Sequence, residues 1–192
     1  MLPVVLEHMK KLGHAVFSKG DYNLNIFGIR GVSRDSDAFD DVLGCAYRRD
    51  GQWVVEYWPA TTDPGRRLLE KPINKMGAAI LCPGQYRGVY RIARHQGKYD
   101  ALCQKGGPVT VYRDDNKDSI LDMDESNKQT GMFGINIHKR AGVRRRVHAS
   151  SAGCQVFDKM RDFDRLMCLA RNQALFGQGD TFTYTLLDQW WE

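Results

Sequence analysis

Short β-prone runs separated by turn residues recur along most of the chain, and they constrain its fold more than any other feature. The run "YNLNIFGIR" (22–30) alternates apolar and polar residues, and Asp50-Gly51 separates two further runs within 43–58. Alternation with a period of two is typical of a strand with one buried face, and Asp-Gly favours a tight hairpin turn. Similar runs follow at 84–95, 98–104, 107–113 and 131–138. The sequence therefore predicts a mainly β fold, built as a β-rich sheet or sandwich.

Two segments carry helical spacing instead. Residues 3–13 repeat apolar side chains at helical intervals between a proline and a glycine, which predicts a short helical appendage in residues 1–20. A substantial helix is predicted after the last β-prone run, capped by Asp158 and ending near Gly177. A final strand-like run occupies 181–191. Since the chain has no internal repeat and no Pro/Ser-rich linker, we expect residues 1–192 to form a single domain of the α+β class.

Composition excludes several classes of protein. Hydrophobic residues make up 42% and charged residues 27% of the chain, as in ordinary soluble globular proteins. No apolar run approaches the roughly 18 residues that a membrane-spanning helix needs, and the N-terminus lacks the pattern of a signal peptide. Five widely spaced cysteines without a Cys-x-x-Cys pair predict reduced thiols. We therefore expect synthesis in a cytoplasm, without a transmembrane segment.

The segment "NIHKRAGVRRRVHASSAGCQVF" (136–157) holds the strongest candidates for chemistry. In "GINIH" the period of two puts Asn136 and His138 on one strand face and the two isoleucines on the other. With the isoleucines packed inward, His138 should project from the polar face at the end of the strand. Rigid strand ends of this kind present catalytic groups well.

Cys154 follows four small residues, "SSAG". Gly153 would leave the neighbouring backbone N–H groups accessible as an oxyanion hole for a tetrahedral intermediate. A nearby imidazole and several arginines would lower the pKa of the thiol and favour a nucleophilic thiolate. A lone cysteine in an apolar context such as "CQVF" is more often a small buried hydrophobe. The residues alone leave both interpretations open.

Together these features resemble the signature of the L,D-transpeptidase catalytic domain, in which a histidine is followed after a loop by Ser/Thr-His-Gly-Cys. "LCPGQYRGVYRI" (81–92) looks like the Pro-x-Gly strand entry of that family, and "GINIH" and "SAGCQV" are similar to compact versions in bacteriophage cell-wall-degrading proteins. The resemblance covers about residues 70–187, and its specific part is 131–157. It implies an L,D-transpeptidase-like β-sandwich or barrel that acts on peptidoglycan stem peptides through a cysteine thioester.

The resemblance also implies roles for single residues. Cys154 would be the nucleophile and His138 the base, while Ser151 and Gly153 would shape the turn and the amides of Gly153 and Cys154 would form the oxyanion hole. If water resolves the thioester, the enzyme is a peptidase. If an amine resolves it, the enzyme is a transpeptidase.

Two positions depart from the family pattern. Ala152 stands where the bacterial enzymes often carry histidine, and Val156 stands where they commonly carry arginine, so the contact to a substrate carboxylate needs another source. The candidates for substrate contacts and for orienting the imidazole are Arg140, Gln155, Asn136 and Tyr86, with Arg87 and His95 on the same strand as Tyr86.

Two metal sites are weighed as alternatives. A calcium-loop template fits the spacing of Asp114, Asn116, Asp118, Asp122 and Glu125, although Ser119 occupies the position that favours glycine. Zinc would need His95, His138, His148 and Cys154, which contain no short-spaced ligand pair. Acidic turn residues and a Cys–His pair explain the same residues without metal, and we expect no cofactor.

The leading hypothesis is a peptidoglycan stem-peptide hydrolase, a cysteine peptidase of bacteriophage lysis or of the virion that acts on the cell wall as a monomer. Alternatives are an L,D-transpeptidase that exchanges cross-links, and a non-catalytic phage module that binds the wall. A basic cluster favours an anionic partner, although it is also compatible with a solvated loop. Its members are Lys139, Arg140, Arg144, Arg145 and Arg146. Nucleic acid is not expected, because no aromatic residues interleave with the cluster.

Overall fold

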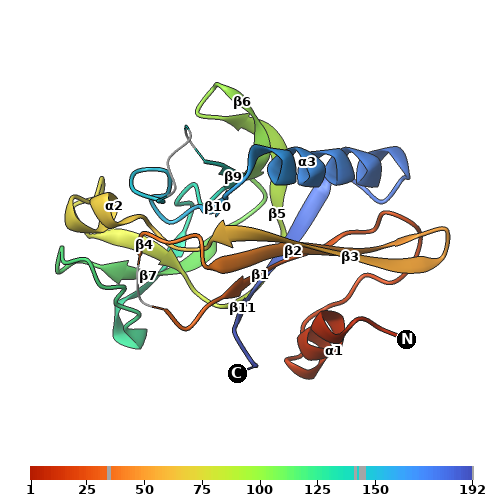
Figure 1. The fold of residues 1–192 in the computed structure, drawn as a ribbon, viewed down its shortest axis with the longest axis horizontal. Helices are drawn as coiled ribbons and strands as arrows, with labels where there is room; N and C mark the ends of the chain where they lie inside the picture. The colour runs from red at the N-terminus through yellow and green to blue at the C-terminus, as the bar shows by residue number, and fades with distance from the viewer. Residues whose placement is uncertain (34–35, 141, 143–145, 192) are drawn as a thin grey trace.

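The computed structural model describes residues 1–33, 36–140, 142 and 146–191, and its main feature is a closed barrel (Figure 1). In pairing order the barrel strands are β1 (Asn25–Arg30), β11 (Thr181–Asp188), β5 (Gly84–His95), β6 (Tyr99–Gln104), β9 (Ile137–Lys139), β10 (Gln155–Phe157), β3 (Gln52–Thr61) and β2 (Asp41–Arg49). Strands β1 and β11 pair in parallel, as do β9 and β10, and the other neighbours are antiparallel. The prediction of a mainly β, α+β fold is confirmed, and of the sandwich or barrel that the resemblance implied, the structure has a closed barrel.

A smaller sheet lies at one end of the barrel, on the left of Figure 1. It contains β4 (Ala78–Leu81), β7 (Val109–Asp114) and β8 (Lys128–Gly131), accompanied by the short helices α2 (Arg66–Glu70) and η1 (Glu125–Asn127). The single strand predicted at 131–138 is wrong, because β8 ends at Gly131 and β9 begins only at Ile137. The side-chain oxygen of Gln104 accepts hydrogen bonds from the amides of 133–135, and these bonds replace strand pairing there.

The hairpin predicted at Asp50-Gly51 is confirmed. These two residues join β2 to β3 and have φ angles of 52° and 73°. Both angles lie in the left-handed region that a two-residue hairpin turn requires.

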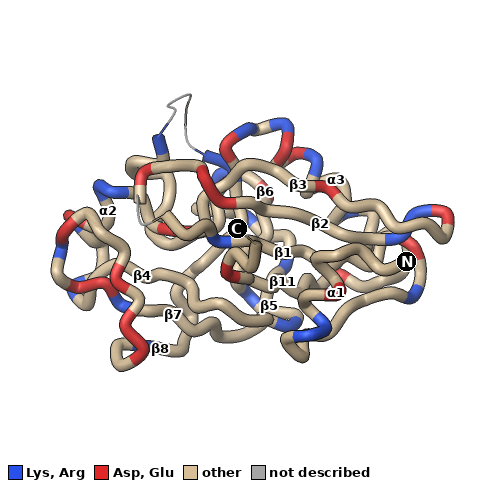
Figure 2. Tube along the Cα trace, turned by 60° about the horizontal axis from the view of Figure 1, so that its bottom comes forward, with Lys and Arg blue, Asp and Glu red and all other residues tan. Residues whose placement is uncertain are grey.

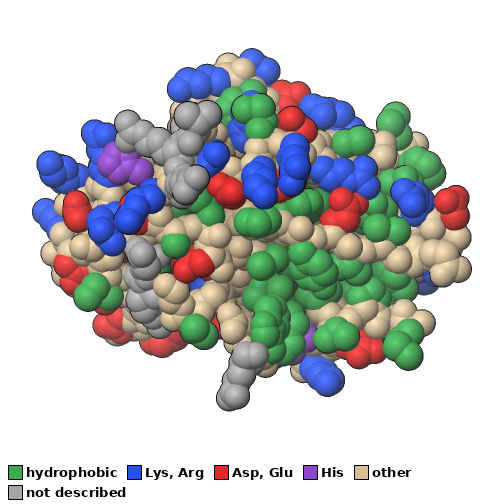
Figure 3. All heavy atoms as spheres, in the orientation of Figure 1, with side chains coloured by type: hydrophobic (Ala, Val, Ile, Leu, Met, Phe, Trp, Pro, Cys, Tyr) green, Lys and Arg blue, Asp and Glu red, His purple; other side chains and the backbone are tan. Residues whose placement is uncertain are grey.

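Helix α1 (Val4–Lys11) confirms the predicted N-terminal helix, but it is packed rather than appended. Its buried side chains form one cluster with residues of β1, β2 and β11. The described members are Val5, Leu6, Met9, Phe27, Ile29, Ala46 and Leu187. Partly buried apolar residues of β2, β3 and the C-terminal segment pack against this cluster, and hydrophobic side chains gather on the corresponding part of the surface in Figure 3.

Helix α3 (Met160–Leu175) is the predicted helix after Cys154, and it runs across the barrel (Figure 1). Its apolar face joins the barrel core through Phe163, Leu166 and Met167. The predicted cap is wrong: Lys159 is the N-cap, and Asp158 forms an ion pair with Arg140 at 3.0 Å.

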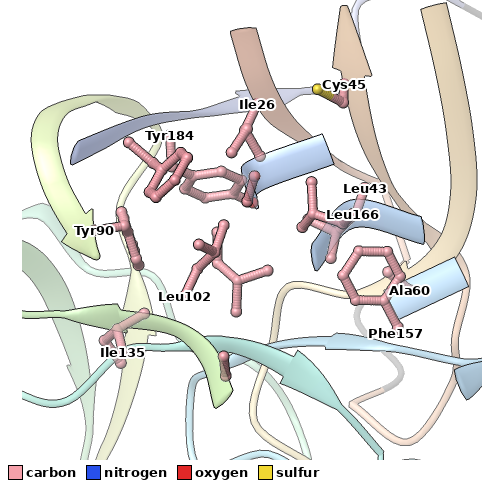
Figure 4. Close-up of a cluster of buried hydrophobic side chains, with 14 of the residues drawn as sticks. Ile26, Leu43, Cys45, Ala60, Tyr90, Leu102, Ile135, Phe157, Leu166 and Tyr184 are labelled. Carbon is pink, nitrogen blue, oxygen red and sulfur yellow. The ribbon is translucent and has the colours of Figure 1, made fainter. Parts of the chain in front are cut away.

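The barrel core is made by alternate residues of the strands. Figure 4 shows Tyr90, Leu102, Phe157 and Tyr184 from the strands meeting Leu166 of α3. Figure 2 shows charged residues on the helices as well as on connecting loops and hairpin ends. Among the described helices, none is long and apolar enough to cross a membrane.

Candidate active site

Strands β9 and β10 bring the histidine and the cysteine of the motif to one face of the sheet. Gln155 lies opposite Ile137 and Val156 opposite His138 in a parallel pair, so Cys154 comes level with Asn136. Neighbouring strands lie about 4.8 Å apart and two residues span about 6.6 Å, which puts the Cα atoms of Cys154 and His138 about 8 Å apart. Side chains of Asn136, His138 and Cys154 therefore share a face, while Ile135 and Ile137 pack into the core as predicted.

The tautomer of His138 follows from its hydrogen bond. Nδ1 lies 2.7 Å from the carbonyl oxygen of Lys139, and the hydroxyl of Tyr99 lies 3.4 Å from the same nitrogen. A carbonyl can only accept, so Nδ1 carries the proton. The lone pair is then on Nε2, which is the arrangement that a general base needs.

His138 is more buried than the sequence indicated. Only 5% of its surface is exposed, because the ring of His95 stacks on it with centroids 4.2 Å apart. This burial, followed by the neighbouring His95, lowers the pKa of His138 to about 4. The imidazole is therefore neutral at pH 7.

Asn136 orients His95 rather than His138, so its predicted role is wrong. The backbone N–H of Gln104 donates to Oδ1 of Asn136 at 2.9 Å, which fixes the amide with Nδ2 as the donor. Nδ2 lies 3.0 Å from Nδ1 of His95, so that nitrogen accepts and His95 carries its proton on Nε2. The stacked pair thus consists of two neutral rings held by different partners.

Cys154 is partly exposed, and its sulfur contacts the backbone. The amide of Asn136 donates to Sγ, and Sγ donates to the carbonyl oxygen of Gly134, both at 3.4 Å. No hydrogen bond joins Cys154 to His138 among the described residues. Desolvation raises the pKa of the Cys154 thiol to about 11, so the expectation of a lowered pKa is wrong.

The described members of the basic cluster contact groups other than the thiol. Arg140 pairs with Asp158, and Arg146 lies 3.7 Å from Asp37. Nζ of Lys139 lies 4.6 Å from the centre of the Tyr99 ring. Arg144 and Arg145 lie outside the described residues. Arg140, predicted to contact substrate, is thus engaged by a carboxylate in the structure.

The turn before the cysteine is held by Ser151 and Gly153. Oγ of Ser151 donates to the carbonyl oxygen of Cys154 at 2.8 Å and accepts from the amide of Gly153 at 3.1 Å. The predicted turn-shaping role of both residues fits this geometry. The Gly153 amide is occupied by this bond, so it does not provide the predicted oxyanion-hole donor.

Two further residues predicted to contact substrate have partners within the fold. Gln155 is fully buried and points into the barrel, where it accepts from the hydroxyl of Tyr184 at 2.7 Å and donates to Thr62. The hydroxyl of Tyr86 donates to the carbonyl oxygens of Cys82 and Thr110. Both side chains stabilise the fold instead.

Sequence reasoning missed two residues that build the site. Tyr99 reaches His138, and Gln104 holds the segment before Asn136. Both lie on β6, whose alternation marks which residues share a face. A short hairpin between β5 and β6 would pair His95 with Tyr99 on one face, as the structure does, but the sequence does not reveal that β6 lies beside β9.

The described residues of the calcium and zinc alternatives do not come together as a metal-ligand group. No group of three or more His, Cys, Asp or Glu side chains that could hold a metal occurs in the part of the chain that the structure describes. Glu125, the last residue of the calcium template, instead binds Lys128 and the hydroxyl of Tyr112. His148 borders a separate cavity with Asp37 and Arg66, away from the stacked histidines.

Comparisons with known proteins found no match: no family model, no curated protein and no solved structure is similar to the chain.

The raised pKa of the Cys154 thiol predicts how its alkylation rate depends on pH. We expect alkylation of Cys154 by iodoacetamide to quicken about tenfold per pH unit from pH 7 to pH 10 without a plateau, because the thiolate is the reactive form. Mass spectrometry of the peptide that contains Cys154 measures the rate. An alkylation rate that stops rising below pH 8 would contradict a neutral Cys154 thiol beside a neutral His138.

Proposed function

We propose that the protein is a peptidoglycan stem-peptide hydrolase of the L,D-transpeptidase type, with Cys154 as nucleophile and His138 as base. The proposal includes an L,D-transpeptidase-like barrel and a role in bacteriophage-mediated breakdown of the cell wall. Transfer to an amine instead of water would make the same site a transpeptidase.

One observation carries the proposal. Two short parallel strands, β9 and β10, hold the histidine and the cysteine on one face, and a backbone carbonyl fixes the imidazole with Nε2 unprotonated. A base oriented by a third group beside a nucleophile is the arrangement that covalent acyl transfer uses.

The protonation states indicate how the reaction proceeds. With pKa values of about 11 for the thiol and about 4 for the imidazole, both groups are neutral at pH 7. Nε2 takes the thiol proton as Sγ bonds to the carbonyl carbon and gives it to the leaving amine as the C–N bond breaks. Water then hydrolyses the thioester, releases the carboxylic acid and restores the thiol.

A second function is favoured by one specific observation. Cys154 and His138 share no hydrogen bond in the described structure, and His95 covers the imidazole. A wall-binding module that lacks chemistry would tolerate this arrangement. It predicts sedimentation with cell walls without new peptide ends.

Incubation of the protein with purified muropeptides, followed by mass spectrometry, distinguishes the two functions. Hydrolysis gives shortened peptides, and rapid acid quenching traps an acyl adduct on the peptide that contains Cys154. Transfer gives products that carry an added amine. Muropeptides that stay intact while the protein sediments with walls would overturn the enzymatic proposal in favour of the binding module.

A further inference from the structure

A cavity of about 290 Å³ lies beside the turn that precedes Cys154. Its walls come from α2 and the segment after it, from the start of β4, from 132–133 and from Ala152. Most of these walls are apolar, and Arg113 of β7 is the charged residue among them. The cavity is therefore a small apolar space with one cation.

Arg113 is buried without an acidic partner. Only 6% of its surface is exposed, and the structure records no ion pair between it and any described carboxylate. Nε donates to Gln129 at 3.0 Å, Nη1 donates to the carbonyl oxygen of Gly77 at 3.3 Å, and the guanidinium lies 4.7 Å from the centre of the Phe133 ring. These neutral contacts hold the group but leave its charge uncompensated.

The second terminal nitrogen of Arg113 has no hydrogen-bond partner among the described residues. Nη2 of Arg113 has no recorded hydrogen bond, yet it is not among the fully buried polar atoms without a partner. It therefore keeps some accessible surface, and Arg113 is one of the residues that line the cavity. An arginine stays charged at neutral pH even where burial lowers its pKa, as it does here.

Another buried arginine provides the comparison. Arg30 is 3% exposed, and its guanidinium lies 2.9 Å from the carboxylate of Asp63. Buried charges are normally paired in this way, because an unpaired charge loses its hydration without compensation. Arg113 has no such carboxylate among the described residues, and the cavity beside it has room for one from a ligand.

Two of the segments that line the cavity also adjoin the thiol of Cys154. Phe133, which stacks under Arg113, precedes Gly134, whose carbonyl oxygen accepts from Sγ of Cys154. Ala152 lines the cavity two residues before Cys154. The cavity therefore adjoins both the segment that contacts the thiol and the turn that precedes it.

We propose that this cavity binds a carboxylate of the peptide substrate through Arg113. The small apolar part of the substrate residue that carries this carboxylate would pack against Ala78 and Ala79. The inference rests on the proposed function and names the substrate group that the site recognises. Carboxylates occur at the C-terminus of a stem peptide and on its side chains, and either one has the chemistry that a guanidinium binds.

Calorimetry with three probes tests the inference in protein that carries Cys154→Ala, so that nothing is cleaved. The probes are one tetrapeptide muropeptide with free carboxylates, the same compound with a C-terminal amide, and the same compound with its side-chain carboxylates amidated. We expect one of the two amidations to weaken binding about 10- to 100-fold, as for loss of a hydrogen bond to a charged group. The amidation that weakens binding identifies the carboxylate.

The Arg113→Gln protein should bind the free and the amidated probes equally. The Arg113→Lys protein should keep part of the preference for the probe with free carboxylates. The matched control is Arg161→Gln, which removes a cation from an exposed position on α3 and should keep the full preference. Circular dichroism verifies that each variant is folded. Equal binding of all three probes by protein with Arg113 intact would overturn the inference.

Failure of the proposed function gives a different result. If wild type cleaves muropeptides but amidation does not change binding, the cavity inference is wrong and the enzymatic proposal stands. If no muropeptide is cleaved but binding still requires Arg113 and a carboxylate, the enzymatic proposal is wrong and the cavity inference stands.

Discussion

Replacing Cys154 with alanine is expected to lower muropeptide cleavage by at least about 10³-fold, because the thioester cannot form without the sulfur. Stability should change little. The thiol is partly exposed, and its two contacts to the backbone of Asn136 and Gly134 are long, at 3.4 Å. We expect a loss of at most about 1 kcal/mol in the free energy of unfolding. Chromatography of muropeptide products and urea denaturation measure the two effects.

The chain offers a matched control for this substitution. Cys168 lies exposed on α3, so Cys168→Ala removes a thiol of the same kind away from the candidate site. This variant should retain wild-type cleavage. A Cys154→Ala protein that cleaves as fast as the Cys168→Ala protein would show that the sulfur has no catalytic role.

Much of the fold could be predicted because its signals are local. The Asp50-Gly51 turn and the final alternating run depend on neighbouring residues, and the structure has both features where the sequence indicates them. The run at 131–138 was mispredicted for a non-local reason. Its amides bind the side chain of Gln104, which comes from a strand about 30 residues earlier.

The site shows the same division. The period of two correctly predicts which face His138 occupies, since alternation is a property of one strand. Whether that face is open depends on what covers it, and here His95 covers it from β5. Gln155 and Asn136 were misassigned for this reason: their side chains bind Tyr184 and His95, from β11 and β5.

The pKa values could not be predicted from sequence at all. The arginines between His138 and Cys154 indicate a positive field that would lower the pKa of the thiol. In the structure Arg140 is neutralised by Asp158, and desolvation dominates at Cys154. Charge counts along a chain therefore say little about a group whose pKa is controlled by burial.

Gly153→Ala is expected to destabilise the protein by about 4 kcal/mol. Gly153 has a φ of 115°, a conformation that costs an alanine about 1–3 kcal/mol. A Cβ atom there would also lie 2.0 Å from the carbonyl oxygen of Ala79, a backbone atom in β4 that can yield only by shifting the strand. Overpacking of this kind adds about 1–3 kcal/mol. Urea denaturation measures the sum.

Gly134→Ala separates the two contributions to this cost. Gly134 also has a positive φ, 72°, but a Cβ atom there would meet nothing within 4 Å. Gly134→Ala should therefore lower the free energy of unfolding only through backbone strain, by about 1–2 kcal/mol. The excess for Gly153→Ala measures how closely the turn packs on β4. Equal losses in the two variants would mean that this contact is loose, and that the turn before Cys154 does not depend on a glycine for its packing.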